Sequence, residues 1–64
     1  MSQYFWKLHD VAGEGAGESE RFAAQDEAEA WMGAHWSRLL GEGVETVSLV
    51  RDDEVLYDMG LREA

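Results

Sequence analysis

Residues 28–40, AEAWMGAHWSRLL, decide the fold of this chain. Their apolar and aromatic side chains recur at intervals of three and four residues, which places them on one face of an α-helix. Carboxylates crowd the expected first turn, where the helix dipole favours negative charge, and a glycine follows the last leucine. The pattern predicts a helix that begins near Gln25 and ends at Gly41, with this apolar stripe: Ala28, Trp31, Met32, His35, Trp36, Leu39 and Leu40.

The segments before the helix differ sharply in composition. Residues 4–11 alternate in character and are rich in aromatic side chains, which is typical of a β-strand. Residues 12–20 interleave three glycines with three glutamates and contain no large apolar side chain, so we expect a flexible Gly/Glu loop there. Residues 21–24 are predicted to form a short strand that pairs back onto the first, with Phe22 pointing inward.

Two further strands are expected after the helix, at residues 44–50 and 55–59, because both runs alternate and the first is rich in β-branched residues. A turn at Asp52 and Asp53 would join them as a hairpin. With Val47 and Leu49 facing the helix, their expected cross-strand partners are Val55, Tyr57 and Met59. The same alternation assigns four apolar residues to the outer face of the sheet: Phe5, Val44, Val50 and Leu56.

These elements predict an α+β fold. One amphipathic helix packs on a small, mainly antiparallel sheet of three or four strands, in the order β-(β)-α-β-β. With 64 residues, the chain is expected to form a single small domain spanning residues 1–64, with a core that contributes no more than about 3 to 5 kcal/mol.

The composition excludes several classes of protein. The chain has no cysteine, which rules out disulfides, thiolate metal sites and cysteine catalysis. It carries 14 acidic against 5 basic residues and a net charge of -9, so it should repel nucleic acid and anionic lipid. No apolar run is long enough to span a membrane and no signal peptide is recognisable, so we expect a cytoplasmic protein. The absence of Ile, Asn and Pro indicates a GC-rich coding sequence and a bacterial source.

No motif predicts a catalytic, cofactor-binding or metal-binding residue. His9 and His35 are the only imidazoles and lack the spacing of a zinc site. The acidic run at residues 52–54 lacks the spacing of a calcium loop, and the serines lack a base at a recognisable distance. An enzyme is therefore the third of three hypotheses, and no small-molecule substrate is expected.

The leading hypothesis is a non-enzymatic protein-interaction module. The chain has more aromatic surface than one helix can cover, and an exposed apolar patch usually marks a contact surface. The aromatic first strand is expected to be an edge at which a second copy pairs, which predicts a homodimer or another protein partner. The predicted interaction surface consists of Tyr4, Phe5, Trp6, Val50 and Leu56.

The alternative hypothesis is an acidic inhibitor that imitates nucleic acid and binds a basic, nucleic-acid-handling protein. A dense carboxylate surface can imitate the charge of a phosphate backbone. Its candidate residues gather around the glycine-rich segment and the helix start: Glu14, Glu18, Glu20, Asp26, Glu27 and Glu29.

Overall fold

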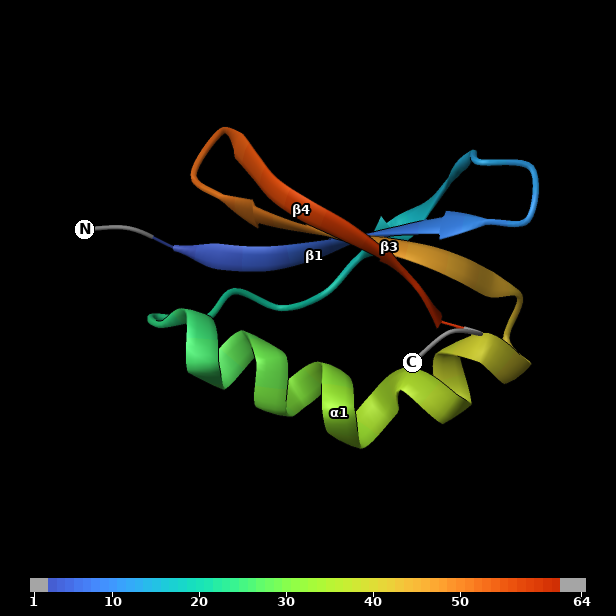
Figure 1. Ribbon diagram of the computed structural model, residues 1–64, viewed down its shortest axis with the longest axis horizontal. Helices are drawn as coiled ribbons and strands as arrows, with labels where there is room; N and C mark the ends of the chain where they lie inside the picture. The colour runs from blue at the N-terminus through green and yellow to red at the C-terminus, as the bar shows by residue number, and fades with distance from the viewer. Residues whose placement is uncertain (1–2, 62–64) are drawn as a thin grey trace.

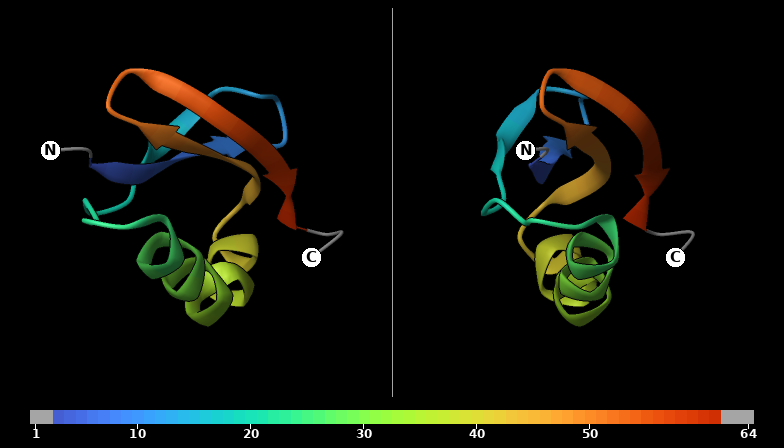
Figure 2. Two further views of the ribbon diagram at one scale, coloured as in Figure 1. Left: turned by 60° about the vertical axis from the view of Figure 1, so that its left-hand side comes forward. Right: turned by 90° about the vertical axis from the view of Figure 1, so that its left-hand side faces the viewer.

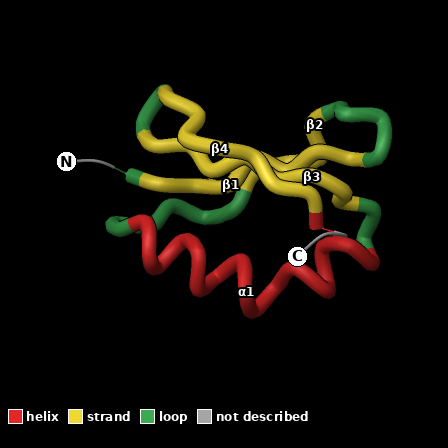
Figure 3. Tube along the Cα trace, in the orientation of Figure 1, coloured by secondary structure: helices red, strands yellow, loops and turns green. Residues whose placement is uncertain are grey.

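One helix packs on one face of a four-stranded antiparallel open sheet, as expected for the α+β fold (Figure 1). The structure is a computed structural model that describes residues 3–61. The strand order is β2-β1-β3-β4, and Figure 3 shows the helix lying along the sheet. The elements are β1 (Tyr4–Asp10), β2 (Gly15–Glu18), α1 (Gln25–Gly41), β3 (Val44–Arg51) and β4 (Glu54–Gly60). No helix within residues 3–61 has the length and apolar character needed to cross a membrane.

The predicted bounds of α1 are confirmed, and the chain reverses just after the helix. Gly41 is the last helical residue, and Gly43 adopts the left-handed conformation, with φ of 99°. The backbone N–H of Glu42 donates to the carbonyls of Arg38 and Leu39, at 3.0 Å each. These bonds keep the backbone helical through Gly41, so the left-handed residue that reverses the chain is Gly43.

The second strand also lies elsewhere than predicted. Residues 15–18, inside the expected flexible loop, form β2 and pair with β1, whereas residues 21–24 contribute only an isolated bridge between Tyr4 and Phe22. The Asp10 carboxylate accepts the backbone N–H groups of Ala12 and Glu14, which closes the connecting turn. Strand pairing uses backbone groups, so this segment joins the sheet with every side chain exposed.

β1 is an internal strand and not the edge that the sequence predicted. It pairs with β2 along one side and with β3 along the other. The prediction was wrong because β2 arises from a segment without apolar side chains, which gives no strand signal. The two edges of the sheet are consequently β2 and β4.

The predicted β3–β4 hairpin forms, with one local change of register. Val47 pairs with Met59 and Leu49 with Tyr57, as expected. A β-bulge then makes Val55 the partner of Val50, so the predicted inward orientation of Val55 was wrong and its side chain is 52% exposed. A bulge inserts one extra residue and shifts all later side chains relative to the partner strand.

Two residues assigned to the outer face lie in or against the core instead. Val44 is buried in it, and Leu56, the extra residue of the bulge, packs against it. Figure 2 shows the layer between sheet and helix that this core fills. Its completely buried large side chains are Trp6, Val47, Leu49 and Leu61.

Candidate binding site

A pocket of about 300 Å³ opens between α1 and β4. The helix lies mainly against β1 and β3, the two central strands, and the pocket lies beside them, where α1 faces the edge strand β4. Helical spacing brings four α1 residues to one wall, and alternation along β4 brings two residues to the other. The lining residues are Trp6, Glu29, Met32, Gly33, Trp36, Tyr57 and Met59.

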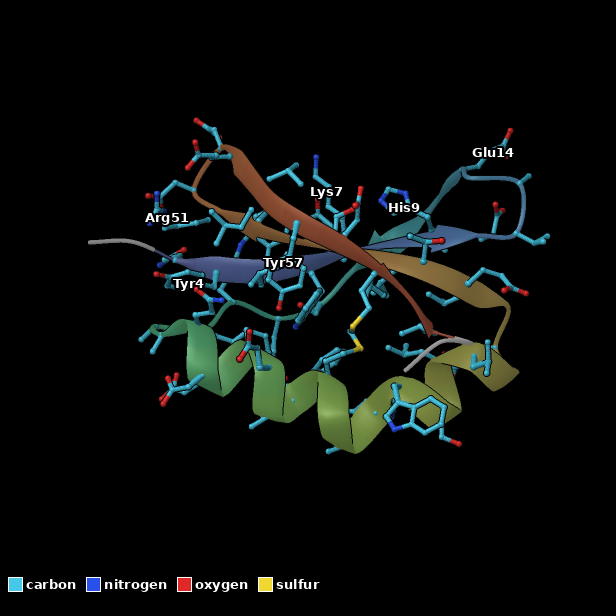
Figure 4. The ribbon with its side chains drawn as sticks, in the orientation of Figure 1. Tyr4, Lys7, His9, Glu14, Arg51 and Tyr57 are labelled. Carbon is cyan, nitrogen blue, oxygen red and sulfur yellow. The ribbon has the colours of Figure 1, made fainter. Side chains whose placement is uncertain are left out.

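The side chains of the pocket are held in place by specific contacts. The Nε1–H of Trp6 donates to the Ala28 carbonyl at 2.8 Å, which fixes the indole at the base. Tyr57 meets this indole edge to face, with ring centroids 5.9 Å apart. Figure 4 shows the Tyr57 side chain reaching from β4 toward α1, where its hydroxyl donates to Glu29 Oε2 at 2.9 Å. This bond links the two walls of the pocket.

The environment of Tyr57 gives the protein a specific response to alkaline pH. Burial, and then the hydrogen bond to Glu29 and the charge of that carboxylate, raise the pKa of Tyr57 to about 12. The ordinary value is about 10, so the folded state holds the phenol proton more tightly than the unfolded state. The stability that this provides is complete below about pH 10 and is lost as the pH rises through 12.

We therefore expect the free energy of unfolding to fall between pH 10 and 12 more steeply in the wild type than in Tyr57→Phe, which keeps the ring and removes the ionisation. Urea denaturation at a series of pH values measures how the free energy of unfolding changes with pH in each protein. Equal slopes in the two proteins would contradict the raised pKa of Tyr57.

The outer face of the sheet carries a second, more polar cavity of about 540 Å³. Phe5 and Val50 lie at its base but are only 7% and 2% exposed. The Arg21 guanidinium stacks over the Phe5 ring at 3.7 Å, which covers it. Lys7 and His9 also project from the side of the sheet away from the helix (Figure 4).

The structure therefore divides the five residues of the predicted interaction surface between the two faces of the sheet. Phe5 and Val50 lie on the outer face, whereas Trp6 is completely buried and belongs to the core. Tyr4 and Leu56 are half-buried and pack against that core. The sequence overestimated the outer patch because strict alternation ignores the bulge in β4 and the covering arginine.

The six carboxylates of the alternative hypothesis are all exposed, and they lie on β2, its flanking segments and the start of α1. Four of them have partners within residues 3–61. The Asp26 carboxylate accepts the backbone N–H of Glu27 at 3.0 Å. Glu18 lies 3.8 Å from Arg21, Glu27 accepts the N–H of Ala23, and Glu29 accepts the hydroxyl of Tyr57.

The histidines and the acidic side chains form no shared site in the described structure. His35 packs against Trp31, with ring centroids 4.6 Å apart, and His9 Nε2 lies 3.2 Å from the Ser48 hydroxyl. Within residues 3–61, no three His, Asp or Glu side chains are grouped so that they would hold a metal ion.

Comparison of the chain with protein-family models, with curated proteins and with solved structures finds no match.

Proposed function

We propose that the protein is a small non-enzymatic interaction module that associates with a second copy of itself through the free edge of β4. One observation carries the proposal: the backbone of β4 points hydrogen-bonding groups away from the sheet at Asp58 and Gly60. Within residues 3–61, three large apolar side chains are exposed, and two of them, Val55 and Tyr57, lie on the same strand. An exposed edge of this kind is a template for pairing with another strand.

The direction of these backbone groups follows from hydrogen bonds on the far side of the sheet. The N–H and carbonyl of Trp6 bond to Ser19, so they point toward the β2 side of β1. In a strand, the backbone N–H and C=O groups of neighbouring residues point to opposite sides. The backbone groups of Lys7 therefore point toward β3 and bond to its partner Ser48. The backbone groups of Ser48 therefore point away from β4. The backbone N–H and C=O groups of Asp58, the β4 partner of Ser48, therefore point away from β3 toward the free edge. Those of Gly60, two residues later, point the same way.

Charge distinguishes two possible registers for the pairing of two β4 strands. A two-fold axis perpendicular to the sheet keeps both α1 helices on the same side and pairs residues of the same face. Centring the axis on Asp58 would place two carboxylates opposite each other, which is unfavourable. Centring it on Met59 places Asp58 opposite the Gly60 of the partner subunit, where both outward-pointing residues exchange hydrogen bonds. We therefore assign the axis to Met59.

We expect Asp58→Pro to abolish the dimer while the chain stays folded. Proline removes an N–H that points to solvent in the monomer, a position where edge strands tolerate it, so the β3–β4 ladder keeps its bonds. Asp58→Ala is the matched control, because it removes the same carboxylate and keeps the N–H. Sedimentation at micromolar concentrations measures the result: the wild type and Asp58→Ala should reach about twice the chain mass of 7.2 kDa, and Asp58→Pro should not.

A cysteine at the assigned axis tests the register. The chain has no native cysteine, so any disulfide dimer comes from the introduced residue. Met59→Cys places two Cα atoms about 4.5 Å apart, within the range of a disulfide, whereas Asp58→Cys places them about 8 Å apart, beyond it. Rapid crosslinking of Met59→Cys alone supports the register. A wild type that stays monomeric in sedimentation, or equal crosslinking at both positions, would contradict the proposal.

Salt separates this proposal from the acidic-inhibitor hypothesis, which the exposure of all six carboxylates favours. Two chains that each carry -9 repel one another, so screening should strengthen the dimer. Binding of the carboxylates to a basic, nucleic-acid-handling protein should weaken steeply with salt. The composition supports a cytoplasmic and bacterial setting for either role.

A further inference from the structure

We propose that the α1–β4 pocket is a binding site for a small quaternary ammonium ion. The pocket combines two accessible aromatic rings, those of Trp36 and Tyr57, with one carboxylate, above the buried indole of Trp6. The sequence predicted no small-molecule ligand, because these residues are brought together only when β4 is placed beside the helix.

The aromatic part of the pocket supplies the surface that a cation without N–H donors prefers. The π-face of tryptophan or tyrosine attracts an ammonium ion within about 6 Å of the ring centroid. Tyr57 on β4 and Trp36 on the helix supply the accessible rings. The completely buried Trp6 packs against Tyr57 with an interplanar angle of 76°, which holds the phenol ring in place. The polarizable sulfurs of Met32 and Met59 fill the remaining wall and accept the methyl groups.

The single carboxylate of the pocket is oriented for a charged ligand. The Tyr57 hydroxyl and the Gln25 side-chain amide both donate to Glu29 Oε2, at 2.9 and 3.2 Å. Among the hydrogen bonds of residues 3–61, none is made to Oε1, so a cation can approach this oxygen without the loss of a protein bond. The net charge of -9 adds a long-range attraction for a cation and disfavours an anion.

The size of the pocket agrees with a small ligand. A volume of about 300 Å³ lies at the lower end of the range for small-molecule sites. Gly33 leaves this space open, since a Cβ added to it would have no heavy atom within 4 Å. Because Gly33 lines the pocket and has open space beside it, we expect a larger side chain at this position to occupy part of the pocket without a clash.

Choline and its neutral isostere 3,3-dimethylbutan-1-ol are the probes that test the site. They have the same shape and differ in the charged atom, so a cation site should bind choline about tenfold more tightly. Chemical-shift titration of the ¹⁵N-labelled chain measures both affinities and reports where each probe binds. The shifts caused by choline should be largest at the indole N–H of Trp36 and the amide of Gly33.

Three variants give the test its specificity. Gly33→Leu fills the pocket and should abolish choline binding, while leucine's higher helix propensity preserves or improves stability. Glu29→Gln should weaken binding about tenfold. Glu20→Gln removes the same charge outside the pocket and should change the affinity less than twofold. Equal affinity for the two probes, equal effects of Glu20→Gln and Glu29→Gln, or binding that survives Gly33→Leu would each overturn the site.

The site does not depend on the proposed dimer, although Tyr57 and Met59 belong to both. The titration is run at two protein concentrations, with the diffusion coefficient measured in the same tubes. Choline binding by a monomeric chain would support the pocket and contradict the dimer, and a dimer without choline binding would do the reverse. The two proposals therefore fail separately.

Discussion

Trp6→Ala should leave the protein largely unfolded at 25 °C. Trp6 is completely buried, touches both layers of the fold and donates its Nε1–H to the Ala28 carbonyl. Truncation of a buried tryptophan to alanine costs about 3 to 5 kcal/mol, because burial of the ring is lost and a cavity remains. The core of a chain of this size contributes about the same free energy to folding, so the variant retains little stability. Far-UV circular dichroism and urea denaturation measure the result.

Two further variants show whether the ring or its hydrogen bond dominates. Trp6→Phe keeps most of the ring and removes the Nε1–H, so we expect a loss of about 1 to 3 kcal/mol and a chain that still folds. Trp36→Ala removes a half-buried indole and should cost less than Trp6→Ala. If Trp6→Ala unfolded cooperatively within 1 kcal/mol of the wild type, the indole would not hold the two layers together.

Leu61→Ala should destabilise the protein by about 2 to 5 kcal/mol, the cost of removing a buried leucine side chain. Leu61 follows the last residue of β4 and is completely buried in the core. Its position near the end of the chain gives no indication of this, since terminal residues are usually exposed. Urea denaturation measures the loss of unfolding free energy. The dependence of that free energy on urea concentration is compared with that of the wild type.

Leu40→Ala is the matched control for this prediction. Leu40 is half-buried at the end of α1 and packs against the same core, and alanine is favourable in a helix. The loss of stability should therefore be clearly smaller than for Leu61→Ala. The reverse order would contradict the burial of Leu61.

The sequence predicted the helix and the hairpin well because their signals are local. The apolar stripe of α1 repeats without a gap, and its predicted bounds, Gln25 and Gly41, are those of the structure. The partners Val47 and Met59 follow from alternation on either side of a short turn. By contrast, Val55 and Leu56 were assigned to the wrong faces, since a bulge is a property of the paired strands.

The candidate sites depended on features that no local pattern contains. β2 forms because the backbone of β1 offers unpaired groups to a segment of glycine and glutamate, and this pairing turns the predicted edge into a central strand. The edge that the sequence assigned to β1 is therefore taken by β2, and β4 forms the opposite edge. In the same way, Glu29 and Tyr57 lie 28 positions apart in the chain, and only the folded arrangement joins them.

The sequence by itself determined the α+β class, the extent of α1 and the hairpin that follows it, because hydrophobic periodicity and turn residues act over a few positions. The tertiary structure alone decided which strand has a free edge, which aromatic side chains are buried and where a pocket lies. Those features arise from backbone pairing and from packing between residues far apart in the chain. Neither kind of interaction produces a periodic pattern in the sequence.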